Sequence, residues 1–146
     1  MKSIRLAEYN ELKLISQLMF NIFEEKMKDR YSIQGVENFK MQIKLTSLQK
    51  RFLADNIFYI YVQDGNIKGV LELERPCHIA FLFSKEPLKG IAKSLCLSAL
   101  NETHEEICTV GAFKDAIGFY EKMGFVKISE EELIHEMPFT LMAQKT

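Results

Sequence analysis

One segment of the chain joins a strand, a short polar loop and a helix that begins at a glycine. The strand is expected at residues 78–83, the loop reads SKEPLKG, and the helix reads GIAKSLCLSAL from Gly90 onward. The first amides of a helix have no partner within the helix, and the helix dipole favours negative charge there. Because Gly90 and Ala92 are small, a phosphate group could approach these amides closely. The segment therefore indicates a phosphate-binding site, and a tight turn is the alternative explanation of Gly90.

A second segment, residues 110–125, reads VGAFKDAIGFYEKMGF. Its part AIGFYEKMGF resembles the A-x-x-FYEKLGF signature of the GCN5-related N-acetyltransferases (GNATs). The helix opening KGIAKSL resembles the end of the acyl-CoA loop of that family, usually written Q/R-x-x-G-x-G/A. The order of the expected elements is also similar to that of the family over nearly the whole chain. The two motifs and their order together make the chain resemble a GNAT.

The resemblance implies an N-acetyltransferase in which a primary amine directly attacks the acetyl group of the cosubstrate acetyl-CoA. Tyr120 then stands at the position of the family's general acid, which protonates the departing CoA thiolate. A phenol suits this role because its proton is available at neutral pH and an apolar site keeps it un-ionised. A core aromatic side chain beside Phe119 is the alternative interpretation of Tyr120.

The resemblance also predicts which residues bind acetyl-CoA. Backbone groups of residues 82–84 would pair with the pantetheine arm and polarise the thioester carbonyl, as an oxyanion hole does. Backbone amides of residues 88–93 would hold the pyrophosphate. The predicted cofactor-binding residues are Leu82, Phe83, Ser84, Leu88, Lys89, Gly90, Ile91, Ala92, Lys93 and Phe119.

His78 is the residue predicted to deprotonate the amine. It begins the strand that leads to the acyl-CoA loop, close to where some family members place a glutamate, and its ordinary pKa of about 6.5 suits a base. Glu72 and Glu74 on the preceding expected strand are alternatives. A mechanism without a single base, in which water carries the proton away, is a further alternative.

Two residues depart from the family pattern. Pro87 takes the place of the first polar residue of the acyl-CoA motif, and Phe113 replaces an asparagine that often precedes the signature. These departures support an alternative function, a catalytically weak or inactive GNAT-fold module that binds acyl-CoA as a sensor. Such a module would bind acetyl-CoA but would release no free CoA with any amine.

Composition limits the partners of the chain. Of 146 residues, 47% are hydrophobic and 27% are charged, which is the balance of one globular domain, here residues 1–146. The formal net charge of −1 gives no basic surface for nucleic acid or for a membrane. The expected partners are therefore acetyl-CoA and an amine acceptor that the sequence does not name. A homodimer is compatible with the sequence.

Cysteine spacing and hydropathy argue against a metal site and a membrane anchor. The three cysteines, Cys77, Cys96 and Cys108, have no CxxC spacing, so reduced and mostly buried thiols are expected and a metal site is not. The N-terminus has no apolar signal segment, and the longest apolar run, residues 57–62, is far shorter than the about 20 residues of a membrane helix. A cytoplasmic enzyme is therefore expected.

Hydrophobic periodicity predicts the element order β-α-α-β-β-β-α-β-α-β-β. The first helix is expected to be capped by Asn10. The expected strands are residues 3–7, 57–62, 67–74, 78–83, 107–110, 125–128 and 137–143, and the other expected helices are residues 36–53, 90–101 and 112–123. This order is typical of an α/β fold. By resemblance to GNATs, it becomes a mixed, bent sheet of about seven strands flanked by about four helices, splayed between its fourth and fifth strands.

Overall fold

The structure, a computed structural model, describes residues 1–86 and 90–145. The strands are β1 (Lys2–Leu6), β2 (Ile57–Gln63), β3 (Asn66–Glu74), β4 (His78–Ser84), β5 (Ile107–Ala112), β6 (Val126–Ile134) and β7 (Met137–Lys145). The α-helices are α1 (Leu12–Lys26), α2 (Ile33–Ile43), α3 (Leu45–Leu53), α4 (Ile91–Glu102) and α5 (Ile117–Lys122). Short 3₁₀ turns are η1 (Tyr9–Glu11), η2 (Lys28–Arg30) and η4 (Lys114–Ala116). The predicted mixed α/β fold with a seven-stranded sheet is confirmed.

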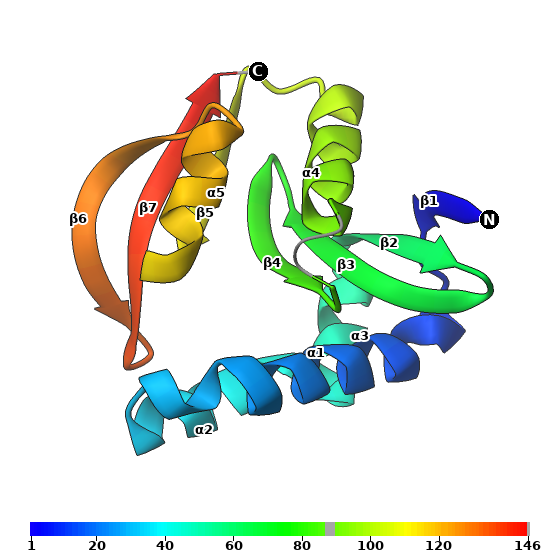
Figure 1. Cartoon of the computed structure of the whole chain (residues 1–146), viewed down its shortest axis with the longest axis horizontal. Helices are drawn as coiled ribbons and strands as arrows, with labels where there is room; N and C mark the ends of the chain where they lie inside the picture. The colour runs from blue at the N-terminus through cyan, green and yellow to red at the C-terminus, as the bar shows by residue number, and fades with distance from the viewer. Residues whose placement is uncertain (87–89, 146) are drawn as a thin grey trace.

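The strands form one sheet in the order β1-β2-β3-β4-β5-β7-β6. Neighbouring strands are antiparallel except β4 and β5, which are parallel and pair only at His78–Thr109 and Ile79–Val110. Beyond these two pairs the strands separate, and Figure 1 shows β4 curving away from β5 and β7. The sheet is therefore splayed between its fourth and fifth strands, as predicted.

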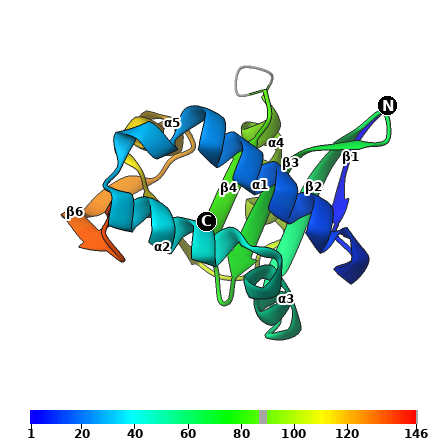
Figure 2. The ribbon, with the colours of Figure 1, turned by 90° about the horizontal axis from the view of Figure 1, so that it is seen from below.

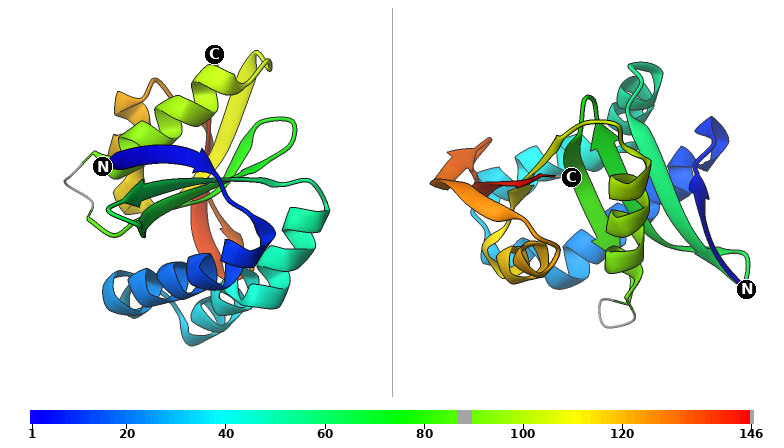
Figure 3. Two further views of the ribbon diagram at one scale, coloured as in Figure 1. Left: turned by 90° about the vertical axis from the view of Figure 1, so that its right-hand side faces the viewer. Right: turned by 90° about the horizontal axis from the view of Figure 1, so that it is seen from above.

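Two helical layers cover the sheet. The helices α1, α2 and α3 lie on one side of it and α4 on the other (Figure 3), and α1 runs beside α2 when the molecule is seen from below (Figure 2). Phe23, Phe39 and Phe58 belong to the core under α1–α3, whereas Leu95 and Phe125 belong to the core that α4 and α5 share. The apolar stripe predicted for the first helix is buried throughout, at Leu12, Ile15, Leu18, Met19, Ile22 and Phe23. Within the described residues no helix is long and apolar enough to cross a membrane.

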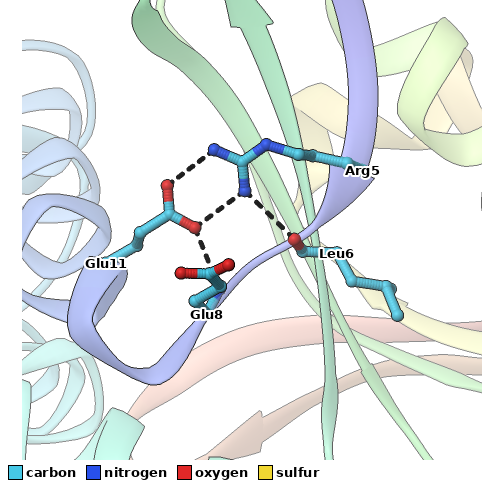
Figure 4. A network of polar contacts seen from close by, with 4 residues as sticks. All are labelled: Arg5, Leu6, Glu8 and Glu11. Carbon is cyan, nitrogen blue, oxygen red and sulfur yellow. Dashed lines mark hydrogen bonds and ion pairs between the residues drawn. The ribbon is translucent and has the colours of Figure 1, made fainter.

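The start of the first helix differs from the prediction. Asn10 lies inside the turn η1 and is not the cap. Instead, the Arg5 guanidinium donates to both carboxylate oxygens of Glu11, each at 2.8 Å, and the Glu8 amide donates to one of them at 2.9 Å (Figure 4). Arg5 also donates to the Leu6 carbonyl at 3.2 Å. A side chain on β1 thus fixes the turn that leads into α1.

Two predicted helices also have different bounds. The expected helix of residues 36–53 is two helices, because Lys44 is extended with φ −70° and ψ 155°. The first of them begins earlier, where the Ser32 side chain accepts a hydrogen bond from the Gly35 amide at 3.0 Å. The helix expected from residue 112 begins only at η4, because Phe113 is extended. These differences explain why five α-helices occur among the described residues where about four were expected.

Candidate active site

Two cavities lie at the splay of the sheet. The smaller has a volume of about 280 Å³ and includes Leu82, Phe83 and Tyr120 in its lining. The larger has a volume of about 700 Å³ and includes His78 and Glu74. Both cavities are lined by Gln42, Ile79, Ala80, Phe81, Gly111 and Phe139. Because they share these residues from α2, β4, β5 and β7, the two cavities meet where β4 leaves β5.

The junction of the cavities coincides with an irregularity in β4. Glu72 of β3 is paired with Phe81, but the next residue, Leu73, is paired with Ile79. Ala80 therefore has no partner of its own, which is the pattern of a β-bulge. A bulge bends its strand and redirects the neighbouring side chains, so the local register of β4 contributes to the opening of the sheet.

The smaller cavity is lined largely by aromatic rings. The ring centroids of Phe113 and Phe139 are 4.6 Å apart, those of Tyr31 and Phe113 are 5.2 Å apart, and those of Phe39 and Phe81 are 5.7 Å apart. All five rings line this cavity. Phe113, which the sequence marked as a departure from the family pattern, is thus part of its wall. Arg30 of η2 and Asp115 of η4 form an exposed ion pair among its lining residues.

Tyr120 places its ring against this cavity from α5. The residue is only 5% exposed, and its ring packs edge-on against Phe119 at 5.1 Å and Phe125 at 5.5 Å between centroids. Burial raises the pKa of the Tyr120 phenol far above its usual range, and the nearby Cys96 and Cys108 thiols raise it further. The phenol consequently keeps its proton across the neutral pH range and can act as a proton donor.

His78 lies at the closed end of the splay, where β4 still pairs with β5. Its Nδ1 is 2.8 Å from the Thr109 hydroxyl oxygen. Burial lowers the pKa of the imidazole, while the negative charge of Glu74 acts in the opposite direction. His78 is therefore neutral at pH 7 and able to accept a proton. Its place in the lining of the larger cavity puts it on the opposite side of the junction from Tyr120.

The two carboxylates considered as alternative bases differ in their surroundings. Glu74 is exposed and lines the larger cavity. Glu72 is completely buried, and its carboxylate accepts hydrogen bonds from Arg51 and Asn56. Because these donors occupy its oxygens, Glu72 is poorly placed to accept a proton from a substrate. The sequence did not predict this cluster; a lone glutamate within an apolar strand segment was its one visible signal.

The start of α4 is open, as a phosphate site requires. Gly90 caps the helix with φ +74°, and a Cβ added to it would meet no atom of the described residues within 4 Å. Ile91 is buried in the core beneath the helix, whereas Ala92 is half-buried and Lys93 is exposed. These four residues lie at the helix start, and none lines either of the two cavities. The predicted residues Leu88 and Lys89, like Pro87, lie outside the described residues.

Ser84 ends β4 just before the loop that leads to α4. Its hydroxyl oxygen is buried and has no hydrogen-bond partner among the described residues. A buried hydroxyl without a partner is costly, but Ser84 lines neither of the two cavities, so this hydroxyl does not by itself indicate a ligand. The helix start at Gly90 fits a molecule with phosphate groups, such as acetyl-CoA. Among the described residues, no cluster of ligands suited to a metal ion occurs.

Comparison with known proteins identifies relatives of the chain. The acetyltransferase (GNAT) domain family matches residues 27–146. A GCN5-related N-acetyltransferase from Rhodopseudomonas palustris has 19% identity and a TM-score of 0.86, with 100% of this chain and 96% of that one covered. The PaiA N-acetyltransferase from Thermoplasma acidophilum, in complex with coenzyme A, has 19% identity and a TM-score of 0.79 over 100% and 99% of the chains. Salmonella typhimurium YncA, with its cofactor acetyl-CoA, has 12% identity and a TM-score of 0.72 over 99% and 94%. No curated protein matches the sequence.

Proposed function

Because the chain belongs to the GNAT acetyltransferase family, we propose that it transfers the acetyl group of acetyl-CoA to a primary amine. The observation that carries this proposal is the meeting of two cavities at the splay, with a buried phenol on one side and a neutral imidazole on the other. The smaller cavity would take the thioester end of the pantetheine arm, and the larger would take the amine. The cavity walls come from α2, β4, β5 and β7, so the whole chain would act as one catalytic domain.

The chain's own residues would divide the work of binding. Backbone amides at the start of α4 would hold the pyrophosphate, since they are free of helical partners and Gly90 leaves them accessible. Along β4, backbone groups of Leu82, Phe83 and Ser84 would pair with the pantetheine amides. The same stretch would polarise the thioester carbonyl. Acetyl-CoA supplies an activated acyl group, and the protein supplies position and proton transfer.

The proposed reaction is a direct transfer. The amine nitrogen attacks the thioester carbonyl carbon, the carbon–sulfur bond breaks, and the sulfur leaves with the bonding electron pair. Tyr120 donates its phenolic proton to the sulfur, and His78 accepts the proton that the nitrogen loses, directly or through water. The products are an N-acetyl amine and free CoA. Return of the proton from His78 to Tyr120 through solvent restores both residues.

Replacement of Gly90 tests the cofactor site. Gly90→Leu places a bulky side chain in the open space before α4, and we expect acetyl-CoA binding to weaken by roughly 10- to 100-fold, the cost of one or two hydrogen bonds to a charged group. Gly90→Ala is the matched control, because it carries the same strain at φ +74° with a much smaller side chain. Isothermal titration calorimetry measures the affinities, and thermal unfolding measures the strain.

Equal affinity for acetyl-CoA in wild type, Gly90→Ala and Gly90→Leu would contradict the α4 site. Release of free thiol from acetyl-CoA in the presence of a panel of amines tests the transfer itself. If the protein binds acetyl-CoA but no amine releases CoA, the sensor function suggested by Phe113 and Pro87 replaces the enzyme.

A further inference from the structure

A charged group that the proposed reaction does not use stands in the wall of the larger cavity. Arg51, in the last turn of α3, donates from Nε to one oxygen of Glu72 at 2.6 Å and from Nη2 to the other at 3.1 Å. Asn56 donates to the same carboxylate at 2.8 Å. Glu72 is fully buried, whereas the Arg51 side chain is 24% exposed and lines the larger cavity. One edge of the guanidinium is therefore fixed by a buried carboxylate.

Phe81 lies against the same guanidinium. The central carbon of the Arg51 guanidinium lies 5.0 Å from the centroid of the Phe81 ring, a cation–π distance. Phe81 is the register partner of Glu72 across β3 and β4, so both contacts of Arg51 come from one place in the sheet. Phe81 also lines both cavities. The guanidinium therefore contacts a residue of the junction where the amine would be acetylated.

The fixed guanidinium keeps donors available. Two of its five N–H groups serve Glu72, and the other three have no hydrogen-bond partner among the described residues. A planar guanidinium held in one orientation is suited to a second carboxylate, which it binds through two parallel hydrogen bonds. A buried ion pair adds little net stability by itself, because desolvation offsets its attraction. Here the ion pair orients the Arg51 guanidinium in the wall of the larger cavity, where it can bind an anion.

The other charges of the larger cavity have the opposite sign. Glu74 at the end of β3 and Glu132 on β6 are exposed and line this cavity together with Arg51. Glu72 compensates the charge of Arg51, so Arg51 would act on a ligand through its three remaining N–H donors. In a molecule that carries both an ammonium and a carboxylate, the ammonium can face Glu74 and Glu132 while the carboxylate accepts from these donors. This arrangement of donors and charges favours a zwitterionic acceptor over a simple amine.

We infer that Arg51 binds a carboxylate of the acceptor, so that the substrates are amines with a nearby carboxylate, as in amino acids. This inference rests on the proposed function of the same site. Arg51 determines specificity here and is not a catalytic residue, because its partner is a substrate group that does not react.

Matched acceptors test the inference. Each of a set of amino acids is compared with its carboxamide and with the amine that lacks the carboxylate, and release of CoA is measured. We expect the carboxylate form to have a kcat/KM roughly 10- to 100-fold higher, the effect of a charge-assisted hydrogen-bonded pair. In Arg51→Lys the charge remains without the planar fork, and we expect the preference to shrink but persist. In Arg51→Met/Glu72→Gln we expect it to vanish. The double variant avoids a buried carboxylate without a partner, so it is expected to fold.

Two readouts separate this inference from the proposed function. Calorimetric titration of the same acceptors into the CoA-saturated protein measures carboxylate recognition without turnover. If amines are acetylated but neither kcat/KM nor affinity depends on the carboxylate, or the amine without a carboxylate is preferred, Arg51 is not a substrate receptor and the acetyltransferase stands. If no amine releases CoA while amino acids bind the wild type and not the double variant, the proposed reaction fails and the role of Arg51 stands. An unchanged preference in the double variant also overturns the inference.

Discussion

The two cavities share one wall, yet their other walls are of different kinds. Aromatic rings from α2, β4, α5, β7 and the segments that follow α1 and β5 form a large part of the wall of the smaller cavity. The larger cavity contains the ionisable side chains Arg51, Glu74, His78, Glu132 and His135, which come from α3, β3, β4, β6 and the turn after β6. A largely apolar wall suits the thioester arm of acetyl-CoA, the cosubstrate that would be the same for every acceptor. Separate charged side chains suit the recognition of a particular acceptor, because each can be substituted without disturbing the others.

Burial acts on Tyr120 and His78 in ways that suit the opposite roles proposed for them. It raises the pKa of Tyr120 and lowers the pKa of His78, because in each case it disfavours the charged form. The phenol therefore keeps a proton to donate, and the imidazole keeps a lone pair to accept one. One physical cause thus suits Tyr120 to the proposed role of acid and His78 to the proposed role of base.

The largest effect is expected from Tyr120→Phe in the smaller cavity. A thiolate that leaves inside an apolar site is poorly solvated, so loss of the phenolic proton should lower kcat by roughly 10²- to 10⁴-fold. The ring and its contacts with Phe119 and Phe125 remain, so affinity for acetyl-CoA should not change. Calorimetry and kcat are measured on one preparation.

Phe125→Leu is the matched control for Tyr120, because it changes a neighbouring ring outside the predicted cofactor-binding residues and leaves the hydroxyl in place. If kcat of Tyr120→Phe stays within about threefold of wild type, the phenol is a packing residue and not the acid. If the variant loses stability instead, the hydroxyl has a structural role in the core.

A smaller effect is expected from His78→Ala in the larger cavity. His78 must be neutral to accept a proton, so kcat/KM of the wild type should fall at acidic pH. Because burial lowers the pKa of His78, the midpoint of this fall should lie below the ordinary histidine pKa of about 6.5. In the variant this acidic limb should be absent, and kcat/KM near pH 7 should be lower by about 10²-fold. A pH–rate profile of both proteins measures the difference.

Thr109→Val is the control, because it removes the hydroxyl next to His78 Nδ1 and keeps the imidazole itself. It should shift the midpoint of the acidic limb without abolishing it. A profile with the same acidic limb in His78→Ala and wild type would assign the proton to Glu74 or to water.

The smallest effect is expected at the edge of the smaller cavity, from Arg30→Gln. The ion pair between Arg30 and Asp115 is exposed on both sides, so water screens it and its loss should cost less than about 1 kcal/mol. Thermal unfolding and the KM for acetyl-CoA should both stay close to those of the wild type. Lys28 lies in the same turn as Arg30 and forms an ion pair with Glu24 of α1. Lys28→Gln, which removes that ion pair, is the control. A KM change confined to Arg30→Gln and larger than about tenfold would show that the pair controls access to the cavity.

The sequence predicted the parts of the fold that depend on local pattern. The buried stripe of α1, the turn at residues 64–66 and the position of Tyr120 follow from helical spacing, from turn residues and from the signature AIGFYEKMGF. The break at Lys44 was not predicted, because the apolar spacing continues across it. The contact of Arg51 with Glu72 was not predicted either. The partners are 21 residues apart on different elements. The residue type alone does not show whether a strand glutamate faces water or pairs with an arginine of another element.

The edge of β4 that faces the splay affects how the sequence of such a chain can diverge in evolution. Beyond Ile79 this edge has no partner strand in the described part of the sheet, so it offers main-chain amides and carbonyls to the opening. Every residue except proline carries both groups, and the bulge at Ala80 is set by register. Substitutions along β4 can therefore accumulate over evolutionary time while the row of donors and acceptors stays in place. A surface made from main chain places few constraints on which amino acids encode it.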